Sequence, residues 1–128
     1  TDWKIYFEFL FPNIYEMQSI HNSNLQEHCE EAGDHTDQER PIEHWLYFQT
    51  EKDMNSAIAK AETLGFSVYN RGKIEPEEGE DPNEDLGYRL ILSKANSVDN
   101  IDPDTWDLID LALDTHGEYD GWETVLVK

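Results

Sequence analysis

Two stretches of the sequence have the apolar spacing of amphipathic helices, and each ends at a glycine. The first begins at Thr50, a residue type that favours the N-cap position, and ends at Gly65. The second begins at Asp102, which we expect to cap the helix, with Pro103 in the first helical position and Gly117 after the last turn. Each helix has an apolar stripe that must be covered by another layer. The side chains expected to face inward are Met54, Ala57, Ile58, Ala61 and Leu64 in the first helix, and Trp106, Ile109, Ala112 and Leu113 in the second.

Four segments with strand composition flank these helices, over residues 42–48, 66–70, 88–95 and 120–127. In the first segment, alternation places one set of side chains on one face and a second set on the other: Ile42, His44, Leu46 and Phe48 against Glu43, Trp45 and Tyr47. The order β-α-β-β-α-β predicts an α+β, ferredoxin-like sandwich, in which both helices cover one face of a four-stranded antiparallel sheet.

The first 33 residues precede this pattern as an extension. Residues 3–11 alternate with period two and predict a strand, whereas residues 13–32 have helical spacing and are followed by Gly33. The apolar positions of this helix are Ile14, Met17, Ile20 and Leu25. We therefore expect a strand-and-helix extension over residues 1–33 and a ferredoxin-like domain over residues 34–128. The extension should pack on the uncovered sheet face or along a sheet edge, because a broad apolar face exposed to water is unusual.

The net charge limits the partners that this domain can bind. The chain has 29 Asp and Glu residues against 9 Lys and Arg, a formal charge of −20. Such an excess repels nucleic-acid backbones and attracts basic protein surfaces. Four Trp, six Tyr and five Phe supply the large apolar side chains that disordered chains lack. The composition therefore predicts a folded domain with an acidic surface and a basic protein partner, without direct nucleic-acid or membrane binding.

Acidic residues concentrate in two places. Residues 75–85 include two prolines and a glycine and predict a solvated loop, and the second helix has aspartates at i, i+3 and i+7, which form a ridge on its outer face. A solvated surface is the simpler interpretation of both, and contact with a basic partner is the alternative. Like charges at this helical spacing cost about 0.2–0.5 kcal/mol per pair without helping the helix fold. The candidate partner-binding residues are Glu75, Glu77, Glu78, Glu80 and Asp81 in the loop, and Asp104, Asp107, Asp110 and Asp114 in the helix.

The sequence lacks the motifs of common enzymes and metal sites. It contains no Gly-rich phosphate loop, nucleophile elbow or paired-histidine motif. His21 and His28 are two helical turns apart, and the adjacent Cys29 points away from His28, so these residues and His35 are poorly spaced for one ion. We expect no enzyme activity, no metal and no cofactor.

The single cysteine, Cys29, cannot form an internal disulfide, which is typical of a reducing compartment. The apolar stretch over residues 3–11 is interrupted by Lys4 and Glu8 and followed by Pro12, so it is too short to span a bilayer and lacks the layout of a signal peptide. We expect a cytoplasmic protein.

An aromatic sheet with this strand order also suggests an RNA-recognition module, with Trp45, Tyr47 and Trp122 stacking on bases. Such modules surround their aromatics with Arg and Lys, whereas Glu43 lies in the first strand here. An acidic mimic of nucleic acid with a different basic partner stays open as an alternative, as does a small domain of unknown enzymatic or ligand-binding activity.

Three short motifs resemble a known family. Ile42-Glu43-His44 opens the first strand, Leu64-Gly65-Phe66 forms a helix-to-strand turn, and Glu118-Tyr119-Asp120-Gly121-Trp122 opens the last strand. Over about residues 34–128 the chain is similar to the bacterial protein inhibitors called regulator of ribonuclease E activity B. The resemblance implies a non-catalytic protein that binds the scaffold region of the ribonuclease, not its active site, and alters the RNA-degrading assembly. An Arg-rich scaffold would suit a domain with a charge of −20.

The simplest role for the motif residues is architectural. Asp120 and Gly121 would shape the entry of the last strand, while Trp122 would fill a core or sheet-face position. Direct contact with a partner is the alternative for these residues and for Tyr119. His44 lies on the apolar face, where we expect a core histidine hydrogen-bonded to a backbone group.

Overall fold

The computed structural model of the chain describes residues 14–79, 81 and 85–128. In chain order the elements are α2 (Ile14–Glu31), β1 (Arg40–Phe48), α3 (Glu51–Thr63), β2 (Ser67–Lys73), β3 (Tyr88–Asn96), the 3-10 turn η1 (Val98–Asn100), α4 (Asp102–Asp114) and β4 (Glu118–Thr124). The strand predicted over residues 3–11 lies outside the described residues.

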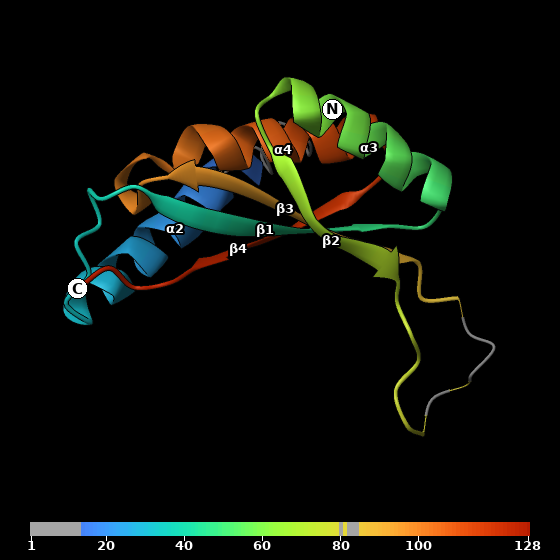
Figure 1. The fold of residues 1–128 in the computed structure, drawn as a ribbon, viewed down its shortest axis with the longest axis horizontal. Coiled ribbons are helices and arrows are strands. Elements are labelled where there is room, and N and C mark those ends of the chain that lie inside the picture. Colours follow the sequence, from blue (N-terminus) through green and yellow to red (C-terminus); the bar gives the residue numbers. More distant parts are fainter. Residues whose placement is uncertain (1–13, 80, 82–84) are drawn as a thin grey trace, which may run out of the picture.

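The four strands form one antiparallel sheet in the order β2-β3-β1-β4. Helices α3 and α4 cover one face of the sheet, called here the inner face (Figure 1). This arrangement confirms the predicted α+β, ferredoxin-like fold. The helix predicted over residues 13–32 corresponds to α2, which packs beside α4. Because β4 covers 118–124 and not 120–127, the last strand begins and ends earlier than predicted.

The main core lies between the sheet and the two covering helices. Alternation along β1 directs Leu46 and Phe48 toward α3 and α4, as predicted. The small side chains of Ala57 and Ala61 are fully buried and let α3 approach the sheet closely. The buried members of this core are Leu46, Phe48, Met54, Ala57, Ala61, Phe66, Leu90, Leu92, Leu108, Leu111 and Ala112.

The two ends of α3 follow the predicted capping pattern. The Oγ1 atom of Thr50 accepts a hydrogen bond from the backbone N–H of Asp53 at 3.2 Å. Gly65 has a φ of 90°, which reverses the chain so that the N–H of Phe66 bonds to the carbonyl of the last helical turn. The prediction that Leu64 is buried was wrong: it is 39% exposed, because it lies one residue beyond the helix.

The predicted start of α4 and part of its inward face were wrong. Asp102 is already helical and makes no side-chain cap, because the turn η1 leads directly into α4. Trp106 and Leu113 are 39% and 58% exposed, whereas Ile109 is buried as predicted. The inward stripe instead includes Thr105, whose hydroxyl donates to the carbonyl of Asp102 at 2.9 Å and can therefore be buried without losing a hydrogen bond.

A buried ion pair joins the connector between α2 and β1 to the end of the chain. The guanidinium of Arg40 makes two hydrogen bonds, of 2.8 and 3.0 Å, to the carboxylate of Asp34. The same guanidinium donates to the carbonyls of His35 and Val125, and Asp34 also accepts from the N–H of Val127. This bidentate pair fixes the segment after β4 against the start of β1.

We predict that Asp34→Asn lowers the free energy of unfolding by about 3 kcal/mol at pH 7, because it leaves a buried guanidinium without a counter-charge. The hydrogen bonds from Arg40 hold the pKa of Asp34 below its usual value. A carboxylate with a lowered folded-state pKa stabilises the fold above its unfolded pKa, about 3.9, and this stabilisation is lost as pH falls through the folded pKa. The difference between wild type and variant should therefore shrink in acid. Urea unfolding from pH 7 to pH 3 measures it, and a difference that stays constant with pH would contradict the prediction.

Candidate partner-binding surfaces

The motif in β1 and the motif in β4 lie side by side in the sheet. In this antiparallel ladder His44 is opposite Trp122. Trp45 is opposite Gly121, and an irregularity at the next step leaves Asp120 as the extra residue of a β-bulge. Gly121 has a φ of 153°, a backbone conformation that residues with side chains rarely adopt. The bulge at Asp120 and Gly121 thus sets the register in which the rest of β4 pairs with β1.

His44 lies fully buried on the inner face of this ladder. Its Nδ1 atom is 2.8 Å from the hydroxyl of Tyr119, and its ring packs edge-on against Phe66 with the centroids 5.6 Å apart. Burial lowers the pKa of His44 to about 4, so the ring is neutral at physiological pH. The expected core position is confirmed, but the expected backbone partner was wrong, since the hydrogen bond is to a side chain.

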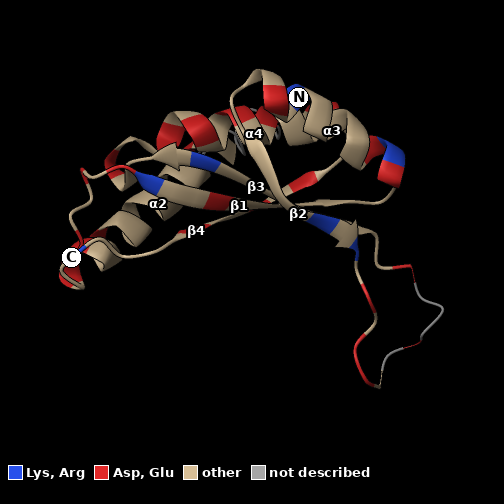
Figure 2. Ribbon diagram, in the orientation of Figure 1, with Lys and Arg blue, Asp and Glu red and all other residues tan. Residues whose placement is uncertain are grey.

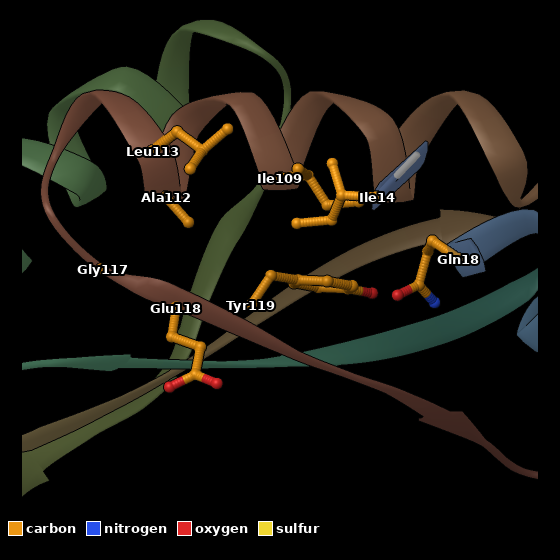
Figure 3. A pocket seen from close by; sticks show the side chains of 8 residues that line it. All are labelled: Ile14, Gln18, Ile109, Ala112, Leu113, Gly117, Glu118 and Tyr119. Atoms are coloured by element: carbon orange, nitrogen blue, oxygen red, sulfur yellow. The ribbon is translucent and has the colours of Figure 1, made fainter. Parts of the chain in front are cut away.

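The neighbouring residues Tyr119 and Glu118 of β4 lie on opposite faces of the sheet. Tyr119 lies beneath α4 beside a hollow lined by Ile109 and Leu113, whereas Glu118 points to the opposite side of the strand (Figure 3). Burial raises the pKa of Tyr119, so its hydroxyl keeps its proton. The inner face of the motif therefore consists of neutral groups held in fixed contacts.

Trp122 is buried and hydrogen-bonded to α2. Its Nε1 atom donates to the Oδ1 atom of Asn22 at 2.7 Å. The amide nitrogen of Asn22 donates in turn to Asp102 at 2.9 Å and to Thr105 at 3.0 Å, and its oxygen also accepts from Gln18. The indole packs against Ile42, Val98 and Ile101. The architectural role predicted for Trp122 matches this position.

Asn22 was not predicted from the sequence, and most of the apolar positions of α2 do not face the rest of the fold. Of the four apolar positions of this helix, three are exposed: Ile14 by 52%, Met17 by 58% and Ile20 by 56%. The fourth, Leu25, is half-buried and packs against the cluster that contains Trp122. The side of α2 that meets α4 carries Gln18, Asn22 and Gln26, which all bond to other side chains. Their i, i+4 spacing is the signal that could have identified a polar helix interface.

Three of the four predicted aspartates of α4 are exposed. Asp107 is exposed, Asp110 accepts a hydrogen bond from the hydroxyl of Tyr15, and Asp114 lies 3.8 Å from Lys60 in an exposed pair. Figure 2 shows these acidic positions along α4. This row is called here the α4 ridge.

Asp104 does not belong to the α4 ridge. It is buried, with one carboxylate oxygen 3.0 Å from the ammonium of Lys94 and the other 2.8 Å from the amide of Asn96. The charge of Asp104 is compensated by Lys94 inside the fold, because a buried carboxylate requires a partner of opposite charge. The prediction that it forms part of an outer acidic face was wrong.

The acidic loop between β2 and β3 is exposed where it is described. Glu80 lies outside the described residues, and the other candidate carboxylates of the loop are all exposed: Glu75, Glu77, Glu78 and Asp81. The hollow lined by the first two of these also contains basic side chains of β2 and β3: Arg71, Lys73 and Arg89. Part of this loop therefore lies close to three basic residues at one end of β2 and β3.

The outer face of the sheet carries the remaining motif residues. Glu43 and Asp120 both line hollows on this face, the second together with Trp45 and Tyr47. Among the described residues, no group of three or more His, Cys, Asp or Glu side chains could hold a metal ion.

Residues 19–124 match the family model described as Regulator of ribonuclease activity B. The chain belongs to this family. A search of the curated proteins finds no match. Membership of the regulator of ribonuclease activity B family connects the chain to the regulation of ribonuclease activity and hence to a protein partner. In the described part of the chain, no helix combines the length and apolarity needed to cross a membrane.

For Trp122→Ala we predict a loss of about 3–5 kcal/mol in the free energy of unfolding, because the change creates a cavity and removes a hydrogen bond to Asn22. Trp106→Ala is the matched control: it truncates an indole that is 39% exposed and should cost much less. Urea unfolding followed by circular dichroism measures both. If the Trp122 variant unfolds with the same free energy as the wild type, Trp122 does not stabilise the core and the prediction is wrong.

Proposed function

We propose that the chain is a non-catalytic acidic regulator that binds a basic protein partner and inhibits or modulates an endoribonuclease of the RNA-degradation machinery. The observation that carries the proposal is a net charge of −20 on a member of a family that regulates ribonuclease activity. A surface of this charge is attracted to an arginine-rich scaffold and repelled by RNA.

The environment of the titratable groups supports a role in binding without catalysis. His44 is fully buried and Tyr119 is half-buried, and both are neutral near pH 7, so neither exchanges protons readily there. The half-buried thiol of Cys29 has a raised pKa, chiefly because of burial, and a reactive cysteine requires a lowered one. A lone reduced cysteine also supports a cytoplasmic location.

The α4 ridge and the acidic loop are the surfaces proposed to attract this partner. Asp107, Asp110 and Asp114 are all exposed on α4. The described part of the loop projects away from the body of the domain (Figure 2). Exposed charges of this kind contribute about 0–1 kcal/mol to stability, so they can be retained for a role in association.

Added protein should slow RNA cleavage by its target endoribonuclease. The inhibition should increase with the amount of protein and level off at a 1:1 molar ratio, because it depends on binding and not on turnover. A fluorescent RNA cleavage assay with increasing amounts of the protein measures this. The protein alone should cleave no RNA and hydrolyse no nucleotide. Robust turnover by the protein alone would contradict the proposal.

Replacing Asp107, Asp110 and Asp114 by Asn should leave the circular dichroism spectrum unchanged and lower the association rate with the endoribonuclease by roughly tenfold at low salt. The defect should shrink as salt rises, because salt screens exposed charges. The matched control replaces three exposed glutamates of α2 by Gln: Glu27, Glu30 and Glu31. Stopped-flow or surface plasmon resonance measures the rates. Equal association rates for both triple variants would exclude the α4 ridge as a specific steering surface.

A further inference from the structure

The outer face of the sheet combines aromatic rings with carboxylates. On β1, the outward positions are Glu43, Trp45 and Tyr47. Across the ladder to β4, Glu43 is opposite Glu123 and Tyr47 is opposite Glu118. Tyr47 and Glu118 are therefore a directly opposed pair, for which Cβ separations of about 4.5–5.5 Å are usual. Trp45 is opposite Gly121 and lines a hollow together with Asp120.

The pair Glu43 and Glu123 is unfavourable for the fold. Two carboxylates directly opposite each other in an antiparallel ladder destabilise the sheet, by up to about 1 kcal/mol. The residue opposite Glu43 on the other side is Ser93, so neither neighbouring strand supplies a positive charge in this row. A repulsive pair on the outer face, between β1 and the edge strand β4, suggests that a cation binds there.

The rings of this face are accessible. Trp45 and Tyr47 are half-buried, and Tyr69, which lies at a bulge in β2, is 64% exposed. Both covering helices lie on the inner face (Figure 1), and α2 reaches the outer face only at its rim, where His21 shares a hollow with Trp45. Within the described residues, then, no helix covers these rings.

The charge of the face determines what can bind to it. The outer face of β1 and β4 carries four carboxylates, whereas the neighbouring strand β3 contributes one outward basic residue, Arg89. The carboxylates belong to Glu43, Glu118, Asp120 and Glu123. A second copy of the chain would bring the same negative face and be repelled. The segment over residues 1–13 contains two acidic residues and one lysine, so its charge does not complement the face either.

We propose that this outer face binds an extended, arginine-rich segment of the basic protein partner. A guanidinium can stack on the face of Trp45 or Tyr47 while it donates two hydrogen bonds to a nearby carboxylate. An ammonium cannot make the same flat, bidentate contact, so the arrangement of rings and carboxylates favours arginine over lysine. The inference rests on the proposed function and adds the binding surface and the chemistry of the bound segment.

A synthetic peptide of alternating Arg and Ser residues, ten residues long, tests this surface directly. It should bind more tightly than the equivalent Lys-Ser peptide of equal charge, by about threefold or more, the usual contribution of one exposed cation–π contact. Isothermal titration calorimetry measures the affinities, and NMR shifts of backbone amides should locate binding on β1 and β4. Equal affinities for the two peptides, or shifts confined to the α4 ridge and the acidic loop, would overturn the proposal.

Two variants separate binding from fold damage. Glu43→Gln with Glu123→Gln should stabilise the protein slightly, because it relieves the repulsive pair, yet weaken binding of the Arg-Ser peptide. Glu27→Gln with Glu31→Gln removes the same charge from the exposed side of α2 and should leave the preference for arginine unchanged. If the first variant binds the peptide as tightly as the second, the outer face is not the site.

The ribonuclease assay distinguishes failure of this inference from failure of the proposed function. If the wild type inhibits the endoribonuclease and the Glu43→Gln, Glu123→Gln variant inhibits equally well, the outer face is excluded while the regulatory function stands. If the wild type does not inhibit but binds the Arg-Ser peptide on β1 and β4, the function is wrong and the binding surface stands.

Discussion

The placement of α2 depends on one buried amide. Asn22 uses both hydrogens of its side-chain nitrogen and accepts two hydrogen bonds at its oxygen, and its partners belong to α2, α4 and β4. A buried amide with all its hydrogen bonds made costs little, whereas the loss of one partner leaves a polar atom unsatisfied. The bond from Trp122 also fixes which side of β4 faces inward. Since a slip of one residue would exchange the two faces of a strand, this bond defines the outer face as well as the core.

The motif shared by β1 and β4 therefore has two distinct sides. On the inner side, His44, Tyr119 and Trp122 are held by packing and hydrogen bonds and have no free charge. On the outer side, Glu43 and Asp120 come from the same short motifs but are not needed for packing. Alternation along a strand allows one motif to specify the register and to present a surface at the same time.

Periodicity in the sequence predicted the elements well but could not identify buried polar contacts. The stripe of α3 is unambiguous because its small and apolar residues share one face, and Thr50 and Gly65 fix its ends. In α4, apolar residues occupy more than one side, so periodicity does not show which side faces inward. The inward side includes Thr105, which accepts a hydrogen bond from Asn22, a residue distant in sequence. The same contact turns a polar side of α2 toward α4 and leaves Ile14, Met17 and Ile20 exposed. Likewise, the sequence shows that Asp104 is acidic but not that Lys94 lies within 3.0 Å of it.

The edge strand β2 has a consequence for how copies of the protein behave when concentrated. All of its residues are exposed, it is interrupted by a bulge near Tyr69, and Arg71 and Lys73 project from it beside Gly72. An exposed edge with unpaired backbone groups is the usual starting point for strand-to-strand aggregation. The bulge distorts the line of backbone donors and acceptors. The positive charges of Arg71 and Lys73 would also repel the same charges on an identical strand that approached this edge. These features protect the sheet from open-ended growth at an edge that no other described strand or helix covers.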